Sequence, residues 1–121
     1  MDRETFQNLI ERAIKDLPEE FREKLTNVAI IVEDYPSKEL IEQLQLQSDD
    51  ALFGLYEGVP LSERGYFEEP ILPDRILIFQ KAIEDECDSD DDIKEELKIT
   101  LVHEIAHFFG MSDEYLEELG Y

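Results

Sequence analysis

The sequence predicts an α+β fold in which a small sheet packs against one long helix, within a single domain that spans residues 1–121. Short runs rich in β-branched and aromatic residues indicate strands, and segments with helical periodicity flank them. Near the C-terminus, a longer segment carries apolar residues on nearly every side, which is typical of a central, buried helix. With 121 residues and a 42% hydrophobic content, the chain can bury one core without disulfides.

Two helices are predicted at the N-terminus. The first ends at Pro18, because a proline cannot continue the pattern of apolar residues spaced three and four apart. A short second helix should follow Pro18 and turn Phe21 and Leu25 inward. The apolar positions of the first helix are Phe6, Leu9, Ile10, Ala13, Ile14 and Leu17.

The middle of the chain predicts three strands. Residues 28–32 form a β-branched run that is typical of a buried strand, and Ser37 can cap a short helix before a turn at residues 48–50. Residues 52–56 and 75–79 supply the other strands, joined by a long connection over residues 58–74.

Gly54 interrupts the second predicted strand. A glycine inside a strand indicates a bulge or a place where another part of the protein comes close. An edge strand that accepts an extended peptide would be one such place, although plain packing is the more frequent reason.

An acidic run over residues 84–92 leads into the long helix, predicted over residues 93–109. Its alternating aspartates resemble a calcium loop, but Ile93 and Ile99 stand where an EF-hand needs a glycine and a bidentate glutamate. We therefore exclude an EF-hand and expect Asp90 or Asp91 to cap the helix.

The chain is strongly acidic, with 32 Asp and Glu against 11 Lys and Arg and a formal net charge of −21. Such a charge repels phosphate backbones and anionic membrane surfaces, so we expect neither nucleic acid nor membrane as a partner. A large net charge most often serves solubility, but this negative charge would also attract basic peptides. The single cysteine, Cys87, and the absence of a leader-like N-terminus indicate a cytoplasmic protein.

Both histidines lie in one motif, His103 to Asp113, which reads HExxHxxGxxD and is a zinc-peptidase signature. Two imidazoles four residues apart on a helix share a face and can converge on one tetrahedral cation, which leaves Glu104 free to act as a base. A single histidine on an apolar helix would more often bind a loop carbonyl. The second histidine and the fixed offsets of Gly110 and Asp113 favour a metal site instead.

Gly110 allows the backbone to turn sharply after the helix, because glycine adopts left-handed dihedrals without steric cost. Such a turn would return Asp113 to the metal as third ligand, with Glu114 and Glu117 as fallback ligands. The alternatives are that Gly110 is an ordinary helix C-cap and that Asp113 is the N-cap of a short last helix.

With these residues, the chain resembles the small bacterial zincin-type metallopeptidases, which are minimal HExxH proteins. The resemblance covers most of the chain after Val28, and four blocks carry it in the order in which that family has them: residues 52–60, 63–65, 72–76 and 103–113.

The resemblance implies a minimal zincin-like α+β fold with a small sheet packed on the active-site helix. It implies His103, His107 and Asp113 as ligands of one Zn²⁺ per chain, and Glu104 as catalytic base. The expected reaction is peptide hydrolysis, in which the metal lowers the pKa of a water molecule from about 15.7 to roughly 7 and Glu104 takes its proton. The expected substrate is a peptide or protein, including basic ones.

A rival interpretation is a non-catalytic, acidic protein-interaction module in which a metal only stabilises the fold. No residue of the motif itself supplies a donor to the transition state, so tyrosines are candidates by residue type alone. Glu96 and Thr100 lie on the His103 side of the helix and are candidates for orienting its imidazole. The tyrosine candidates are Tyr56, Tyr66, Tyr115 and Tyr121.

Overall fold

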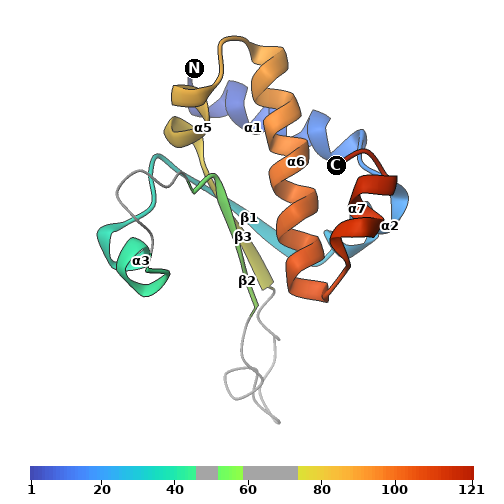
Figure 1. The fold of residues 1–121 in the computed structure, drawn as a ribbon. Helices are drawn as coiled ribbons and strands as arrows, with labels where there is room; N and C mark the ends of the chain where they lie inside the picture. Colours follow the sequence, from blue (N-terminus) through green and yellow to red (C-terminus); the bar gives the residue numbers. More distant parts are fainter. Residues whose placement is uncertain (46–51, 59–73) are drawn as a thin grey trace.

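The computed structural model describes residues 1–45, 52–58 and 74–121, and it has the expected α+β architecture (Figure 1). The predicted turn at residues 48–50 and nearly all of the connection predicted over residues 58–74 lie outside the described residues. The elements are α1 (Arg3–Lys15), α2 (Glu19–Lys24), β1 (Val28–Glu33), α3 (Lys38–Gln43), β2 (Gly54–Glu57), β3 (Asp74–Phe79), α5 (Gln80–Glu86), α6 (Asp90–Phe109) and α7 (Asp113–Glu118).

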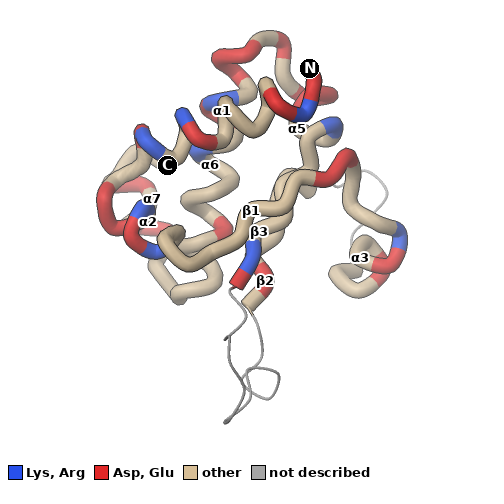
Figure 2. Tube along the Cα trace, turned by 180° about the vertical axis from the view of Figure 1, so that it is seen from behind, with Lys and Arg blue, Asp and Glu red and all other residues tan. Residues whose placement is uncertain are grey.

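The three strands form one mixed sheet in the order β1-β3-β2. β1 runs parallel to β3, and β2 runs antiparallel to it, with Gly54 opposite Ile78 and Tyr56 opposite Ile76. Figures 1 and 2 show α1, α2, α6 and α7 on one side of the sheet and α3 on the other. Among the described strands, β2 therefore lies at an edge of the sheet, and α6 contacts it directly.

The core fills the space between the sheet, α1 and α6. Phe6 of α1, Ile76 of β3 and Leu101 of α6 are fully buried and belong to one apolar cluster. The prediction that α6 is buried on nearly every side is wrong at three positions, because the side chains of Ile99, Phe108 and Phe109 are 38%, 47% and 46% exposed. The last two follow His107 directly, so the C-terminal end of the helix presents aromatic surface.

Serine hydroxyls cap the last two helices of the chain, so the prediction that Asp90 or Asp91 caps α6 is wrong. Ser89 Oγ accepts a hydrogen bond from the Asp92 amide, which places Asp90 and Asp91 inside the first turn of α6. Ser112 Oγ accepts from the Tyr115 amide at the start of α7, and Asp113 is the first residue of that helix. A capping hydroxyl and an acidic first turn both stabilise a helix N-terminus, so the acidic residues act here through the helix dipole.

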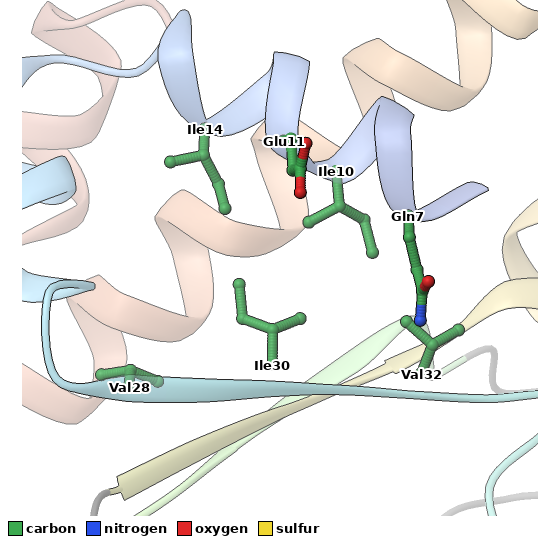
Figure 3. Close-up of a pocket in the computed structure, with 7 residues that line it drawn as sticks. All are labelled: Gln7, Ile10, Glu11, Ile14, Val28, Ile30 and Val32. Carbon is green, nitrogen blue, oxygen red and sulfur yellow. The ribbon is translucent and has the colours of Figure 1, made fainter. Parts of the chain in front are cut away.

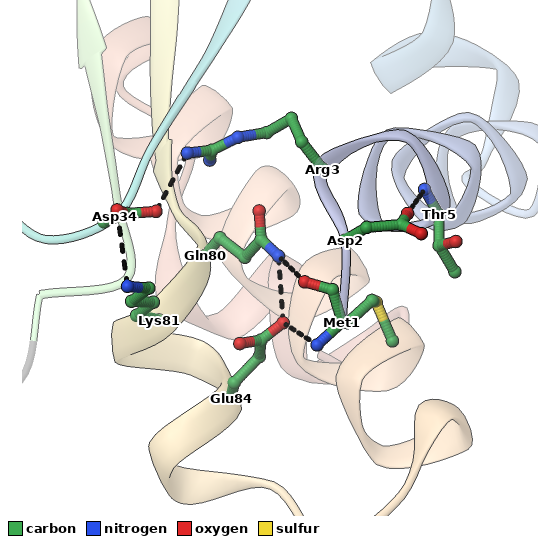
Figure 4. Close-up of polar contacts among 8 residues, drawn as sticks. All are labelled: Met1, Asp2, Arg3, Thr5, Asp34, Gln80, Lys81 and Glu84. Carbon is green, nitrogen blue, oxygen red and sulfur yellow. Dashed lines mark hydrogen bonds and ion pairs between the residues drawn. The ribbon is translucent and has the colours of Figure 1, made fainter.

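Helix α5 was not predicted, because its C-terminal half is acidic and merges with the acidic loop before α6. Gln80, at its start, is only 4% exposed and donates to the Met1 carbonyl and to Glu84 Oε1, each at 2.9 Å (Figure 4). Arg3 and Lys81 both pair with Asp34, at 2.8 and 3.6 Å. These long-range contacts join the N-terminus to α5, and no local pattern in the sequence indicates them.

In the part of the chain that the structure describes, no helix has the length and apolar character required to cross a membrane.

Gly110 ends α6 in the left-handed region, with φ +70° and ψ +27°, as the sequence predicts. A Cβ at this position would meet no atom within 4 Å, so a side chain would be resisted by the backbone conformation alone. Gly110→Ala should therefore lower the free energy of unfolding by about 1 kcal/mol. Chemical denaturation measures the change. Gly110→Asn is the matched control, because asparagine tolerates this conformation and should lose less; equal stability of the alanine variant and the wild type would contradict the prediction.

Candidate metal centre and general base

His103 and His107 lie one turn apart on α6, near its C-terminal end. Their ring centroids are 6.0 Å apart and the ring planes are inclined by 74°. A zinc ion lies about 2.0–2.1 Å from a ligating ring nitrogen, so two rings on one tetrahedral ion have centroids roughly 5 Å apart. The observed separation of the two rings is near this value but longer. His103 is half-buried and His107 is exposed, so the pair opens to solvent on one side.

The predicted third ligand lies after the Gly110 turn. Asp113 begins α7 with an exposed side chain, and Glu114 and Glu117 of the same helix are exposed as well. Within residues 1–45, 52–58 and 74–121, no three side chains among His, Cys, Asp and Glu are arranged so that they could hold a metal ion. The two imidazoles on one helical face suit zinc by donor type, and the role of Asp113 stays a prediction.

Glu104 is the part-buried carboxylate beside the histidines, and it contacts the edge strand. Its Oε1 accepts a hydrogen bond from the Tyr56 backbone N–H of β2 at 3.0 Å. Burial raises the pKa of Glu104 above its ordinary value, while the Tyr56 amide and the imidazoles of His107 and His103 act in the opposite direction. Sequence patterns did not indicate the Tyr56 contact, because it joins residues 48 positions apart through a backbone atom.

The aromatic ring of Tyr56 packs against two rings at the end of α6. The Tyr56 ring stacks on Phe108 with centroids 4.1 Å apart, and Phe109 meets both rings edge-on. The Lys24 ammonium lies 4.7 Å above the Phe109 ring. The exposed aromatic end of α6 thus packs against β2 and α2.

The candidate tyrosines differ in their surroundings. Tyr56 donates its phenolic hydrogen to Asp74 at 2.8 Å, and the Tyr115 hydroxyl is bound to Glu20, which raises the pKa of Tyr115. Tyr121 packs against the core, and Tyr66 lies outside the described residues. The assignment of a transition-state donor among them stays a prediction.

Of the two candidates for orienting His103, Glu96 is the one whose charge interacts with the imidazole. Burial raises the pKa of Glu96, and the nearby His103 opposes this shift. Among the described residues, no hydrogen bond joins Glu96 or Thr100 to either imidazole. Thr100 is buried at 8% exposure and contacts β2 instead.

A separate groove of about 350 Å³ lies between α1 and β1 (Figure 3). Figure 3 shows Val28, Ile30 and Val32 pointing from the strand towards the helix. Among the described residues that line the groove, Glu11 is the only ionisable one, and none is a histidine. The described lining of the groove therefore lacks the pair of imidazoles that the end of α6 carries.

A model of the zincin-like metallopeptidase family matches residues 25–121, which is most of the chain. The protein therefore belongs to the zincin-like metallopeptidase family. Among solved structures, the fold is similar to that of a "conserved hypothetical protein" from Thermo thermophilus, with 23% sequence identity and a TM-score of 0.57. The match covers 98% of this chain and 97% of that one. The comparison with curated proteins finds no match.

Proposed function

We propose that this protein is a zinc-dependent peptidase that binds one Zn²⁺ per chain through His103, His107 and Asp113. Glu104 serves as the general base. Membership of the zincin-like metallopeptidase family supports the proposal. The observation that carries it is the grouping of two imidazoles on one face of α6 with a part-buried carboxylate held by the edge strand.

Zinc, when bound, supplies a Lewis acid and lowers the pKa of water near it. The remaining chemistry belongs to the chain. Because Tyr56 N–H holds one oxygen of Glu104, the other oxygen can accept a proton from water that attacks a peptide carbonyl. The carboxyl group then delivers this proton to the departing amine, so Glu104 ends the cycle ionised as it began.

The proposed substrates are peptides or proteins, with basic sequences favoured, in a cytoplasmic setting. The net charge of −21 would concentrate cationic chains near the protein. Figure 2 shows acidic residues over several helices, including α2, α7 and the start of α6, whereas the strands carry few charges. The attraction would therefore act over much of the surface.

The same charge supports a second candidate function, a non-catalytic acidic module that binds a basic protein and uses metal only for stability. The two functions predict different behaviour of metal-loaded protein. A catalytic site keeps one coordination position for water or substrate, whereas a structural site is closed by a fourth protein ligand.

The direct test incubates zinc-loaded protein with a defined pool of synthetic peptides that includes Lys- and Arg-rich members, and mass spectrometry identifies the products. We expect about one zinc per chain, cleavage by the loaded protein, and loss of cleavage after chelation with recovery on zinc addition. Failure to bind zinc would overturn the proposed metal site. Zinc binding without cleavage of any peptide would favour the interaction module.

A further inference from the structure

Strand β2 comes unusually close to helix α6 at Gly54. A Cβ built on Gly54 would lie 2.7 Å from Thr100 Cγ2 and 3.1 Å from the Leu77 carbonyl oxygen. Neither neighbour can easily move, because Thr100 is buried and the carbonyl belongs to the adjacent strand. The contact therefore depends on the absence of a side chain at residue 54, and the glycine is explained by close approach to a helix.

The hydrogen-bond pattern of the sheet determines the direction of the Gly54 and Tyr56 backbone N–H groups. The Phe79 amide donates to the Phe53 carbonyl at 2.9 Å, so these two residues form a hydrogen-bonded pair of the antiparallel ladder. Hydrogen-bonded pairs alternate along such a ladder, so Gly54 and Tyr56 direct their backbone N–H groups away from β3. The Tyr56 N–H indeed reaches Glu104 Oε1.

The distance between the two contacting residues is also nearly the same on the strand and on the helix. Gly54 and Tyr56 are two residues apart, which spans about 6.6 Å along a strand. Thr100 and Glu104 are four residues apart, which spans about 6 Å along a helix. The approach of Gly54 to Thr100 and the hydrogen bond from Tyr56 N–H to Glu104 therefore lie one helical turn apart on α6.

We propose that Gly54 is a positioning residue for Glu104. By letting β2 rest directly on Thr100, it places the Tyr56 backbone N–H where it fixes one oxygen of the carboxylate and leaves the other for proton transfer. This inference rests on the proposed function for its catalytic consequence. The geometric part, in which Gly54 controls the hydrogen bond from Tyr56 to Glu104, is testable without activity.

The geometric test is hydrogen exchange of the Tyr56 amide, measured by NMR on the whole zinc-free chain. Gly54→Ala should speed this exchange roughly tenfold, the factor expected when a hydrogen bond to a charged group is lost. Glu104→Ala should do the same, because it removes the acceptor. Adding Thr100→Ser to Gly54→Ala removes the methyl group that the new Cβ meets, and it should restore much of the protection relative to Thr100→Ser alone.

The catalytic test compares the same variants on a peptide that the wild type cleaves. Gly54→Ala should lower kcat about tenfold with unchanged zinc affinity and unchanged KM, and the Thr100→Ser second change should recover most of the loss. Normal Tyr56 protection in Gly54→Ala, or a double variant as impaired as Gly54→Ala in both measurements, would overturn the inference. A wild type that cleaves nothing would overturn the proposed function instead, while the exchange data would still decide the role of Gly54.

Discussion

Glu104→Gln should lower peptide hydrolysis by roughly 10²–10⁴-fold, the usual contribution of a positioned general base. Glutamine has nearly the same shape, and its amide oxygen can still accept the hydrogen bond that Tyr56 N–H makes with Glu104. What it lacks is the ability to take a proton from water. Zinc content should stay at the wild-type level, because the proposed ligands are untouched. Steady-state kinetics on a cleaved peptide, with metal analysis of the same samples, measure both effects.

Stability provides the control for this substitution. Burial raises the pKa of Glu104, so folding disfavours its charged form above that raised pKa. Glutamine removes this penalty, and zinc-free Glu104→Gln should be at least as stable as the wild type at neutral pH. Its advantage should shrink as the pH falls and the wild-type carboxyl becomes protonated. Turnover that is unchanged in a folded, zinc-loaded variant would exclude Glu104 as the base.

Local patterns in the sequence predicted much of the fold. The spacing of Phe6, Leu9 and Ala13 predicted α1, and β-branched runs predicted β1 and β3, because burial of one face imposes a period on the sequence. Helix α5 was missed because long-range contacts of Gln80 with the N-terminus hold it. The cap of α6 was misassigned because serine and aspartate are similarly favoured at that position, and only the local geometry decides between Ser89 and Asp90.

The candidate site, like the fold, could be predicted from the sequence only in part. Helical periodicity placed His103, His107 and Glu104 together, and the φ of Gly110 agrees with the predicted sharp turn. The contact between Glu104 and the backbone of Tyr56 could not be predicted, because every residue other than proline has an N–H group and the strand register selects the one that is used. In the sequence, only the glycine at position 54 indicated that β2 comes close to another part of the protein.

Zinc should stabilise the wild-type protein against unfolding, and His107→Ala should abolish this effect. A ligand that binds only the folded state at about 100 times its Kd adds about 2.7 kcal/mol to the free energy of unfolding. His107 is exposed, so its replacement should change the stability of the zinc-free protein by no more than about 0.5 kcal/mol. Denaturation curves with and without zinc separate lost binding from lost folding. An equal zinc response in the variant and the wild type would remove His107 from the site.

The same measurement can identify the third ligand among Asp113, Glu114 and Glu117, all exposed on α7. Amide replacements Asp113→Asn, Glu114→Gln and Glu117→Gln remove one anionic donor each with little change in shape. We expect only Asp113→Asn to weaken the zinc response strongly, because the turn at Gly110 would bring the first residue of α7 back to the histidines. The two glutamine variants then serve as matched controls for the loss of one negative charge. A full response in Asp113→Asn with loss in Glu114→Gln or Glu117→Gln would move the third ligand to that glutamate and leave the histidine pair in place.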